Sequence, residues 1–250
     1  MLQIDRMELA DIGSPVKLAA AVIDGAAGLT LPIPVEQIAA ALDIIEIRPI
    51  TVSGFEGGLI TTDDKSSGYI LINDRSSGQR QRFTIGHELG HYLNPWHLVG
   101  AGESFMCSKA DMVASQYQPS DRRPKMEVEA NQFAAELLMP AKFFRPDIKR
   151  LKAPDLEHIV VLATKYDVSK AAMARRYAEF QDEPCAVVFS KNGKITYTLK
   201  QQYFPQLAVW RGDSIPAQAV TKSFAEPAGC VSEWKEHASD IWLKYQGKHA

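Results

Sequence analysis

The run His87-Glu88-Leu89-Gly90-His91 places two imidazoles and one carboxylate within five residues. In an α-helix, residues four apart lie on one face, so both histidines can reach a single metal ion at about 2.0–2.1 Å. Glu88 lies one step further round the helix, where it can face a water molecule on that metal. Zinc lowers the pKa of such a water to ~7, and the glutamate can then take its proton as general base. The H-E-x-x-H pattern is typical of zinc metallopeptidases.

The segment around this run has the features of a helix. Residues 79–93 contain no proline, Ser76 or Ser77 can cap the start, and an Asn-Pro pair follows the end. Gly86 and Gly90 each weaken a helix by roughly 1 kcal/mol relative to alanine. We interpret this cost as the consequence of a close approach by another part of the chain to that helix face.

A catalytic zinc site needs three protein ligands and an open position for water, and the chain offers the third ligand from two places. His97 would extend the motif to H-E-x-x-H-x-x-N-x-x-H, which is similar to the metzincin pattern. The other place is the helical stretch 127–140, where Glu127 and Asn131 lie four apart on one face. A polar partner can orient a carboxylate ligand. Glu129 is a fallback on a different face of the same helix, and the residues alone leave these alternatives open.

Two blocks of sequence together resemble the ImmA/IrrE family of metallo-endopeptidases. The first is R-F-T-I-G-H-E-L-G-H at residues 82–91, and the second is E-x-x-A-N-x-F-A-A-E-L-L-M-P at residues 127–140. Both stand in the order of that family, and the resemblance covers about residues 30–180. The connection from Pro95 to Lys125 is longer than in the common pattern, and we expect it to border the substrate cleft.

The resemblance implies a specific site and a class of substrate. The implied zinc ligands are His87, His91 and Glu127, and the implied general base is Glu88. His97 is then a loop histidine near the cleft. The family typically cleaves a regulatory protein, so the resemblance implies a protein partner such as a helix-turn-helix transcriptional repressor of stress-response or mobile-element genes, or a toxin–antitoxin component.

Three short segments ahead of the metal-binding helix have the pattern of β-strands, at residues 44–48, 58–62 and 69–72. We therefore predict an α+β fold with a zincin-like catalytic domain. In it, a small β-sheet packs with the H-E-x-x-H helix and a second helix carries Glu127. An extended peptide could add a strand to an exposed sheet edge, and Leu59–Thr62 is the candidate edge.

The pattern of the chain changes twice after this region. We predict a zinc metallopeptidase domain at residues 1–150, a helical pair resembling a helix-turn-helix at 151–182, and a small β-rich module at 183–250. Asn192-Gly193 is a hairpin signal within the last part. Further strands are expected around Trp210, Trp234 and Trp242.

The composition favours a cytoplasmic globular enzyme. The net charge of −2 gives no general attraction to nucleic acid or to an anionic membrane. No run approaches the ~20 apolar residues of a membrane helix, and the N-terminus has no apolar core of signal-peptide length. The three cysteines, Cys107, Cys185 and Cys230, are widely spaced, so we expect neither a disulfide framework nor a thiolate zinc site.

Two other classes of function compete with a peptidase. A non-catalytic zinc-fold regulator or antitoxin-like binding protein would have no need of the base Glu88. A DNA-binding regulator could use residues 155–180, but the second helix there carries few cations: Lys170, Arg175 and Arg176. Three residues near the motif are candidates for stabilising the oxyanion of a peptidase reaction: Tyr92, His97 and Tyr117.

Overall fold

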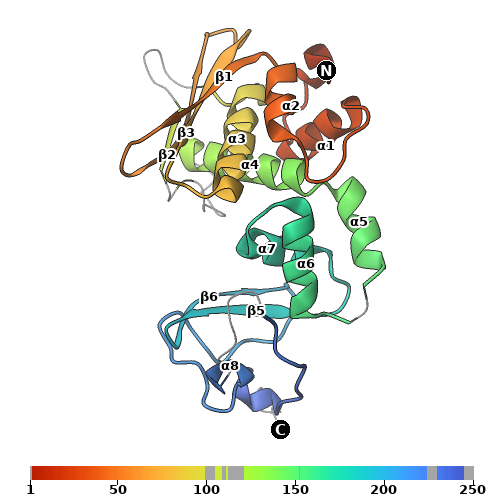
Figure 1. Ribbon diagram of the computed structural model, residues 1–250, viewed down its shortest axis with the longest axis vertical. Coiled ribbons are helices and arrows are strands. Elements are labelled where there is room, and N and C mark those ends of the chain that lie inside the picture. Colours follow the sequence, from red (N-terminus) through yellow and green to blue (C-terminus); the bar gives the residue numbers. More distant parts are fainter. Residues whose placement is uncertain are drawn as a thin grey trace. The chain divides into compact units, whose positions relative to one another are not determined.

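The computed structural model describes residues 2–98, 105–108, 111, 121–151, 153–223 and 230–244 of the 250 in the chain (Figure 1). Contacts within the chain separate it into two units. The first comprises residues 1–147 and 163–169, and the second comprises residues 148–162 and 170–250. The H-E-x-x-H run and the Glu127 run both lie in the first unit, and the fold is of the mixed α+β class.

The first unit contains a four-stranded sheet in the order β1-β3-β2-β4. Its strands are β1 (Ile44–Ile50), β2 (Phe55–Thr61), β3 (Gly68–Asn73) and β4 (Phe105–Ser108). β1 runs parallel to β3, whereas β2 is antiparallel to both of its neighbours. Alternation of apolar residues predicts β1, β2 and β3 to within a few residues, but it does not predict β4.

The prediction of an exposed sheet edge at Leu59–Thr62 is wrong. β2 lies inside the sheet, because Leu59 pairs with Ile70 of β3 on one side and with Phe105 of β4 on the other. Among the described strands, the edges are β1 and β4. The strand that covers β2 comes from the long connection between the two motif blocks, where a run of four residues is too short to show a period.

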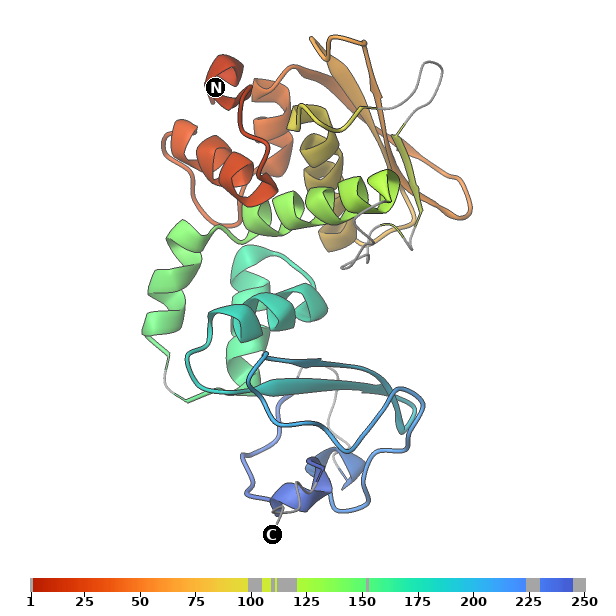
Figure 2. The ribbon, with the colours of Figure 1, turned by 180° about the vertical axis from the view of Figure 1, so that it is seen from behind.

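Helices account for most of the rest of the described first unit. They are α1 (Pro15–Gly25), α2 (Val35–Ala41), α3 (Gly78–Leu93), α4 (Arg122–Leu138) and the start of α5 (Ala141–Lys149), preceded by the 3-10 turn η1 (Arg6–Leu9). α3 contacts β2, β3 and α4, and Figure 2 shows α4 lying across α3. The side chain of Ser77 caps α3 by accepting a hydrogen bond from the backbone N–H of Arg80. The helix ends at Asn94, immediately before Pro95, as the sequence predicts.

Close approach between α3 and α4 explains the two glycines of α3. A Cβ added to Gly86 would lie 3.3 Å from the Cβ of Ala134. A Cβ added to Gly90 would lie 3.1 Å from both the Cα of Ala130 and the Cβ of Phe133. Because ordinary van der Waals contact begins near 3.5 Å, only glycine lets the two backbones come this close.

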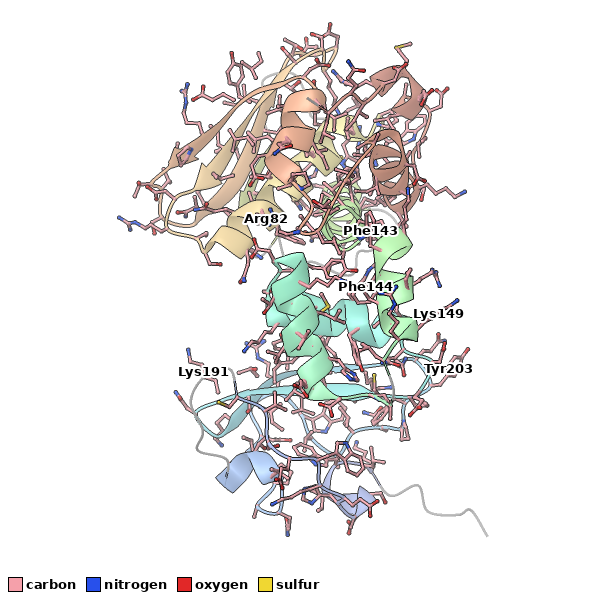
Figure 3. All side chains as sticks on the ribbon, turned by 45° about the vertical axis from the view of Figure 1, so that its right-hand side comes forward. Arg82, Phe143, Phe144, Lys149, Lys191 and Tyr203 are labelled. Atoms are coloured by element: carbon pink, nitrogen blue, oxygen red, sulfur yellow. The ribbon has the colours of Figure 1, made fainter. Side chains whose placement is uncertain are left out.

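Residues 163–169 join the first unit through a few specific contacts with α5. The ammonium of Lys165 and the hydroxyl of Tyr166 both donate hydrogen bonds to the carboxylate of Asp147, at 2.7–2.8 Å. The ring of Tyr166 also meets the ring of Phe144 edge-on, with centroids 5.5 Å apart. Figure 3 labels Phe144 on α5, where its side chain is fully buried. These contacts fix the end of the helix that carries Tyr166.

The second unit begins with a helical pair and continues with a hairpin. The pair consists of α6 (Leu156–Tyr166), whose last turn belongs to the first unit, and α7 (Lys170–Phe180). The hairpin consists of β5 (Ala186–Lys191) and β6 (Lys194–Lys200), and Asn192 and Gly193 both have positive φ between the strands, as the hairpin signal predicts. Further on lie α8 (Val220–Ser223) and the 3-10 turn η3 (Ser239–Ile241).

The strands expected around Trp210, Trp234 and Trp242 are not found. In the described part of residues 201–244, pairing is limited to two isolated bridges, and a small cluster of Ile195, Leu207 and Val209 replaces a second sheet. The prediction from the tryptophans was wrong, because tryptophan favours strands mainly through the way its side chain packs on a sheet and less through its backbone conformation. In the described ranges, no helix has both the length and the apolar character needed to cross a membrane.

The tight contact between α3 and α4 leads to a stability prediction for Gly90→Ala. Alanine gains about 1 kcal/mol of helix propensity, but overpacking a rigid contact costs ~1–3 kcal/mol. We expect a net loss of about 1 kcal/mol in the free energy of unfolding, measured by chemical denaturation of metal-free protein.

Gly78→Ala is the matched control, because a Cβ at Gly78 meets nothing within 4 Å. It should leave the free energy of unfolding unchanged or slightly raise it. A Gly90→Ala variant as stable as the wild type would show that α3 and α4 can separate without cost.

Candidate metal centre

Three elements of the first unit bring metal-ligating side chains together. α3 contributes His87 and His91, α4 contributes Glu127, and β4 contributes Cys107. One ligand atom from each lies within 4.8 Å of all the others, and all four residues are buried. The two helices therefore join side chains that are 40 positions apart in the sequence.

The spacing of three of these atoms matches the coordination shell of one small ion. Nε2 of His87 lies 3.1 Å from Nε2 of His91 and 3.1 Å from Oε2 of Glu127. Nε2 of His91 lies 3.5 Å from the same carboxylate oxygen. Nitrogen and oxygen ligands held at 2.0–2.1 Å in a tetrahedron are about 3.3 Å apart. The three atoms thus occupy one face of such a tetrahedron.

Asn131 of α4 orients the first imidazole. Nδ1 of His87 lies 2.9 Å from Oδ1 of Asn131, so Nδ1–H donates to the amide oxygen and Nε2 keeps its lone pair for a metal. The amide nitrogen of Asn131 donates to the backbone oxygen of Asp111 at 2.9 Å, which fixes which end of the amide faces the ring. The sequence places Asn131 on the same face as Glu127, and the structure shows that its partner is His87.

A second pair of side chains orients the other imidazole. Nδ1 of His91 lies 3.0 Å from Nδ1 of His97, and Nε2 of His97 lies 2.9 Å from Oε2 of Glu129. When Nε2 of His91 faces the cluster, its Nδ1–H donates to His97, whose Nε2–H donates to the carboxylate of Glu129. His97 and Glu129, both alternatives for the third ligand, therefore lie behind His91 and outside the four-residue cluster.

Glu88 is a fully buried carboxylate next to the ligand atoms. Neither of its oxygens has a hydrogen bond of ordinary geometry within the described residues. Burial raises the pKa of Glu88 well above its usual value, and the nearby charge of Glu127 raises it further, whereas a contact with the thiol of Cys107 acts in the opposite direction. A buried carboxylate with so little hydrogen bonding costs free energy unless a further polar group meets it. A positive ion with a water molecule between the ligands and Glu88 would supply that group, so the donor set fits a metal site.

The protonation states of Glu127 and His91 also suit metal binding. Burial is the largest influence on Glu127 and acts to raise its pKa, but the imidazoles of His87 and His91 on either side outweigh it in the metal-free protein and hold the pKa well below its usual value. Burial lowers the pKa of His91 to about 3, so its ring is neutral at physiological pH. A metal needs an ionised carboxylate and neutral imidazoles, and the site provides both.

One residue of the cluster was not expected from the sequence, and the structure describes only one of the two tyrosine candidates for stabilising the oxyanion. Cys107 lies in the ligand cluster although its spacing from other cysteines gives no sign of it. The guanidinium of Arg6 lies over the ring of Tyr92, 4.6 Å from the ring centroid, so Tyr92 lies beside η1. Tyr117 lies outside the described residues.

The chain matches the model of a known protein family. The model of the IrrE N-terminal-like domain, a peptidase family, matches residues 44–177, more than half of the chain. The matched range includes α3, β4 and α4, and therefore every residue of the ligand cluster.

Two relatives are similar over shorter stretches. The radiation response metalloprotease IrrE of Deinococcus radiodurans is 28% identical over 127 residues, which is 51% of this chain and 35% of that protein. An uncharacterized immunity region protein of Bacillus phage phi105 is 37% identical over 78 residues, which is 31% of this chain and 41% of that protein. The chain thus covers less than half of the length of either relative.

The hydrogen bond between His87 and Asn131 leads to a prediction about metal affinity. Asn131→Ala leaves the Nδ1 of His87 without its acceptor, so the ring is no longer fixed toward the metal. Losing such an outer contact typically weakens metal binding by ~10–100-fold. Competition with a chromophoric chelator measures the effect, and the exposed neighbour Gln132, changed to alanine, serves as control. Equal affinities of the two variants would contradict the orienting role.

The buried titratable groups predict how metal-free protein responds to acid. Burial lowers the pKa of His97 to about 4 and that of His91 to about 3, against an ordinary value of ~6.5. As the pH falls from 6.5 to 4.5, the unfolded chain therefore takes up protons on these two residues that the folded chain does not, and the difference approaches two protons. Glu88 has the opposite effect, because burial raises its pKa above that of the unfolded chain.

Because Glu88 opposes the two histidines, the free energy of unfolding of the wild type should fall only weakly as the pH drops from 6.5 to 4.5. Glu88→Gln removes the opposing contribution, and its free energy of unfolding should fall by about 2 kcal/mol per pH unit over the same range. Denaturant unfolding at several pH values measures both slopes. A flat profile in Glu88→Gln would show that the two histidines are not neutral when buried.

Proposed function

The chain belongs to the family of the IrrE N-terminal-like peptidase domain, and from this membership we propose that it is a zinc-dependent endopeptidase. The observation that carries the proposal is the fully buried Glu88 carboxylate, which interacts with Glu127 and Cys107 of a cluster in which three ligand atoms are spaced for one tetrahedral ion. A structural metal site has no use for such a carboxylate, whereas hydrolysis needs a base at that place.

We assign His87, His91 and Glu127 as the zinc ligands. Two imidazoles and one carboxylate form one of the ligand sets of catalytic zinc. His97 and Glu129 are assigned to orientation of His91, on the strength of their hydrogen bonds. When bound, the ion would supply Lewis acidity, which makes a water molecule easier to deprotonate and a scissile carbonyl easier to attack.

Glu88 is the proposed general base. Its carboxylate takes a proton from the attacking water and passes it to the leaving amine, so one residue serves both proton transfers. The raised pKa suits this task, because a base that must later act as an acid works best with a pKa near the working pH. Burial also excludes bulk water from the proton that is being carried.

The proposed domain organisation follows from the position of this site. Residues 1–150 would form a zincin-like catalytic domain, with the four-stranded sheet and the two ligand-bearing helices α3 and α4. Residues 151–182 would form the helical pair, and residues 183–250 a separate module built round the β5–β6 hairpin. This module carries no ligand cluster in its described part, which suits a role in recognition or stability.

The proposed substrate is a specific regulatory protein, such as a transcriptional repressor. Support comes from the family resemblance and from the names of the two relatives, which refer to a radiation response and to a phage immunity region. Stress response and control of transcription are therefore the processes that we propose for this chain.

The test of this function compares wild type with Glu88→Gln, which keeps the shape of the side chain and removes its basicity. Both proteins should bind one zinc per chain, because Glu88 is not a ligand. Cleavage of a proteome-derived peptide library, followed by mass spectrometry, should fall by ~10²–10⁴-fold in the variant. Glu127→Ala should lose the metal as well as the cleavage, whereas Gln132→Ala should keep both. Cleavage by Glu88→Gln at the wild-type rate would contradict the assignment of the base.

A further inference from the structure

Cys107 is the fourth member of the ligand cluster. Its Sγ is 3.4 Å from Nε2 of His87 and 3.6 Å from Oε2 of Glu127, and the residue is only 2% exposed. With sulfur at about 2.3 Å and nitrogen or oxygen at 2.0–2.1 Å from a tetrahedral zinc, sulfur would lie about 3.5 Å from each of the other ligand atoms. Both distances match this expectation.

Several contacts on both sides of the thiol hold it in this position. Within β4, Cys107 pairs with Gly57 of β2, which has no side chain to compete for the space. The next residue, Ser108, donates from its backbone N–H and from its hydroxyl to the carboxylate of Asp111, both at 2.8 Å. Asp111 in turn accepts a hydrogen bond from Asn131, the side chain that orients His87. The strand is therefore anchored to the ligand helix α4.

The residue before Cys107 provides another anchor. The backbone oxygen of Met106 accepts a hydrogen bond from the guanidinium of Arg123 in α4, at 3.3 Å. Contacts on both sides of Cys107 thus connect β4 to the helix that carries Glu127. A thiol fixed in this way does not reach the cluster by a chance rotation of its side chain.

A thiolate in the fourth position would turn an open, catalytic type of site into a closed one. Two imidazoles, a carboxylate and a thiolate complete a four-coordinate shell, which is the closed arrangement of structural zinc. Catalytic zinc keeps its fourth position for water, and that is the water from which Glu88 would take a proton. A metal ion deprotonates a thiol that coordinates it, so the buried neutral thiol would become a ligand when zinc binds.

We propose that Cys107 is a fourth zinc ligand and that it holds the peptidase in a closed, latent state. This inference rests on the proposed function, because it needs a metal at His87, His91 and Glu127. Peptide hydrolysis requires water to replace the sulfur in the fourth position, and the departing thiolate takes up the proton that the neighbouring Glu88 carboxyl gives up, which leaves Glu88 ionised as the base. β4 is an edge strand of four residues in the described sheet, so displacing it breaks backbone pairing on one side, together with the contacts that Met106 and Ser108 make.

Cobalt replacement tests the ligand directly. Co²⁺ prefers the same donors as Zn²⁺, and a thiolate bound to it gives an intense charge-transfer band in the near ultraviolet. Wild-type protein titrated with CoCl₂ should bind one ion per chain and show this band. Cys107→Ala should keep the visible bands of bound cobalt but lose the near-ultraviolet band. Cys185→Ala, which removes a half-buried thiol of the second unit, should keep both.

The same proteins test the latent state. With zinc bound, Cys107→Ala should cleave the peptide library at least about tenfold faster than wild type, since water no longer competes with sulfur. Cys185→Ala should cleave at the wild-type rate. Equal rates for wild type and Cys107→Ala would overturn the closing role of the thiolate.

The outcomes separate this inference from the proposed function. Bound cobalt without a charge-transfer band in the wild type would overturn the cysteine ligand and leave the three-ligand site standing. Absence of bound cobalt in the wild type would overturn both. Because the wild-type spectrum alone decides whether sulfur binds, a folding defect in Cys107→Ala would not leave the ligand assignment open.

Discussion

The site depends on one packing constraint, which is the close approach of α3 to α4. Gly86 and Gly90 let the two helix backbones meet where any larger residue would hold them apart. This contact places two imidazoles from one helix within 3.1–3.5 Å of a carboxylate from the other. A shift of one ångström between the helices would remove the carboxylate from the coordination sphere. The spacing of these side chains therefore depends on having glycine at positions 86 and 90.

Charge explains why such a buried cluster needs an ion. Glu88 and Glu127 are two buried carboxyl groups, and the charge of Glu127 raises the energy of the ionised form of Glu88. A divalent cation would balance the charge of Glu127 and one further anion, either Glu88 or the thiolate of Cys107. The open and the closed forms of the site would therefore carry similar net charge. They would differ in whether water or sulfur occupies the last position.

Local patterns in the sequence predict the parts of this site that depend on local structure. The cap at Ser77, the end of α3 before Pro95 and the shared face of His87 and His91 all follow from helix geometry and capping. The hairpin at Asn192-Gly193 follows from turn conformation in the same way. The third of the proposed ligands could not be chosen from local patterns, because residue types alone left His97, Glu127 and Glu129 open. Only the packing of the two helices separates the one that joins the cluster from those that lie behind His91.

The parts that could not be predicted depend on long-range pairing. β4 is a four-residue strand without a period, and its pairing with β2 both buries Leu59 and carries Cys107 to the ligands. The same strand invalidates the expected sheet edge at Leu59–Thr62. A lone cysteine in a polar connection does not by itself indicate a metal site, since the residues that form the cluster with Cys107 lie on two helices elsewhere in the sequence. The fold brings Cys107 close to the two helices, and neither composition nor sequence spacing predicts this.

The central claim is that α3 and α4 together hold one catalytic metal ion. Crystals of zinc-loaded protein, with anomalous diffraction recorded on both sides of the zinc absorption edge, test it most directly. The account predicts a single strong anomalous peak per chain within bonding distance of His87, His91 and Glu127, and beside Glu88. Absence of a peak there, or a peak coordinated by His97 and Glu129 instead, would contradict it.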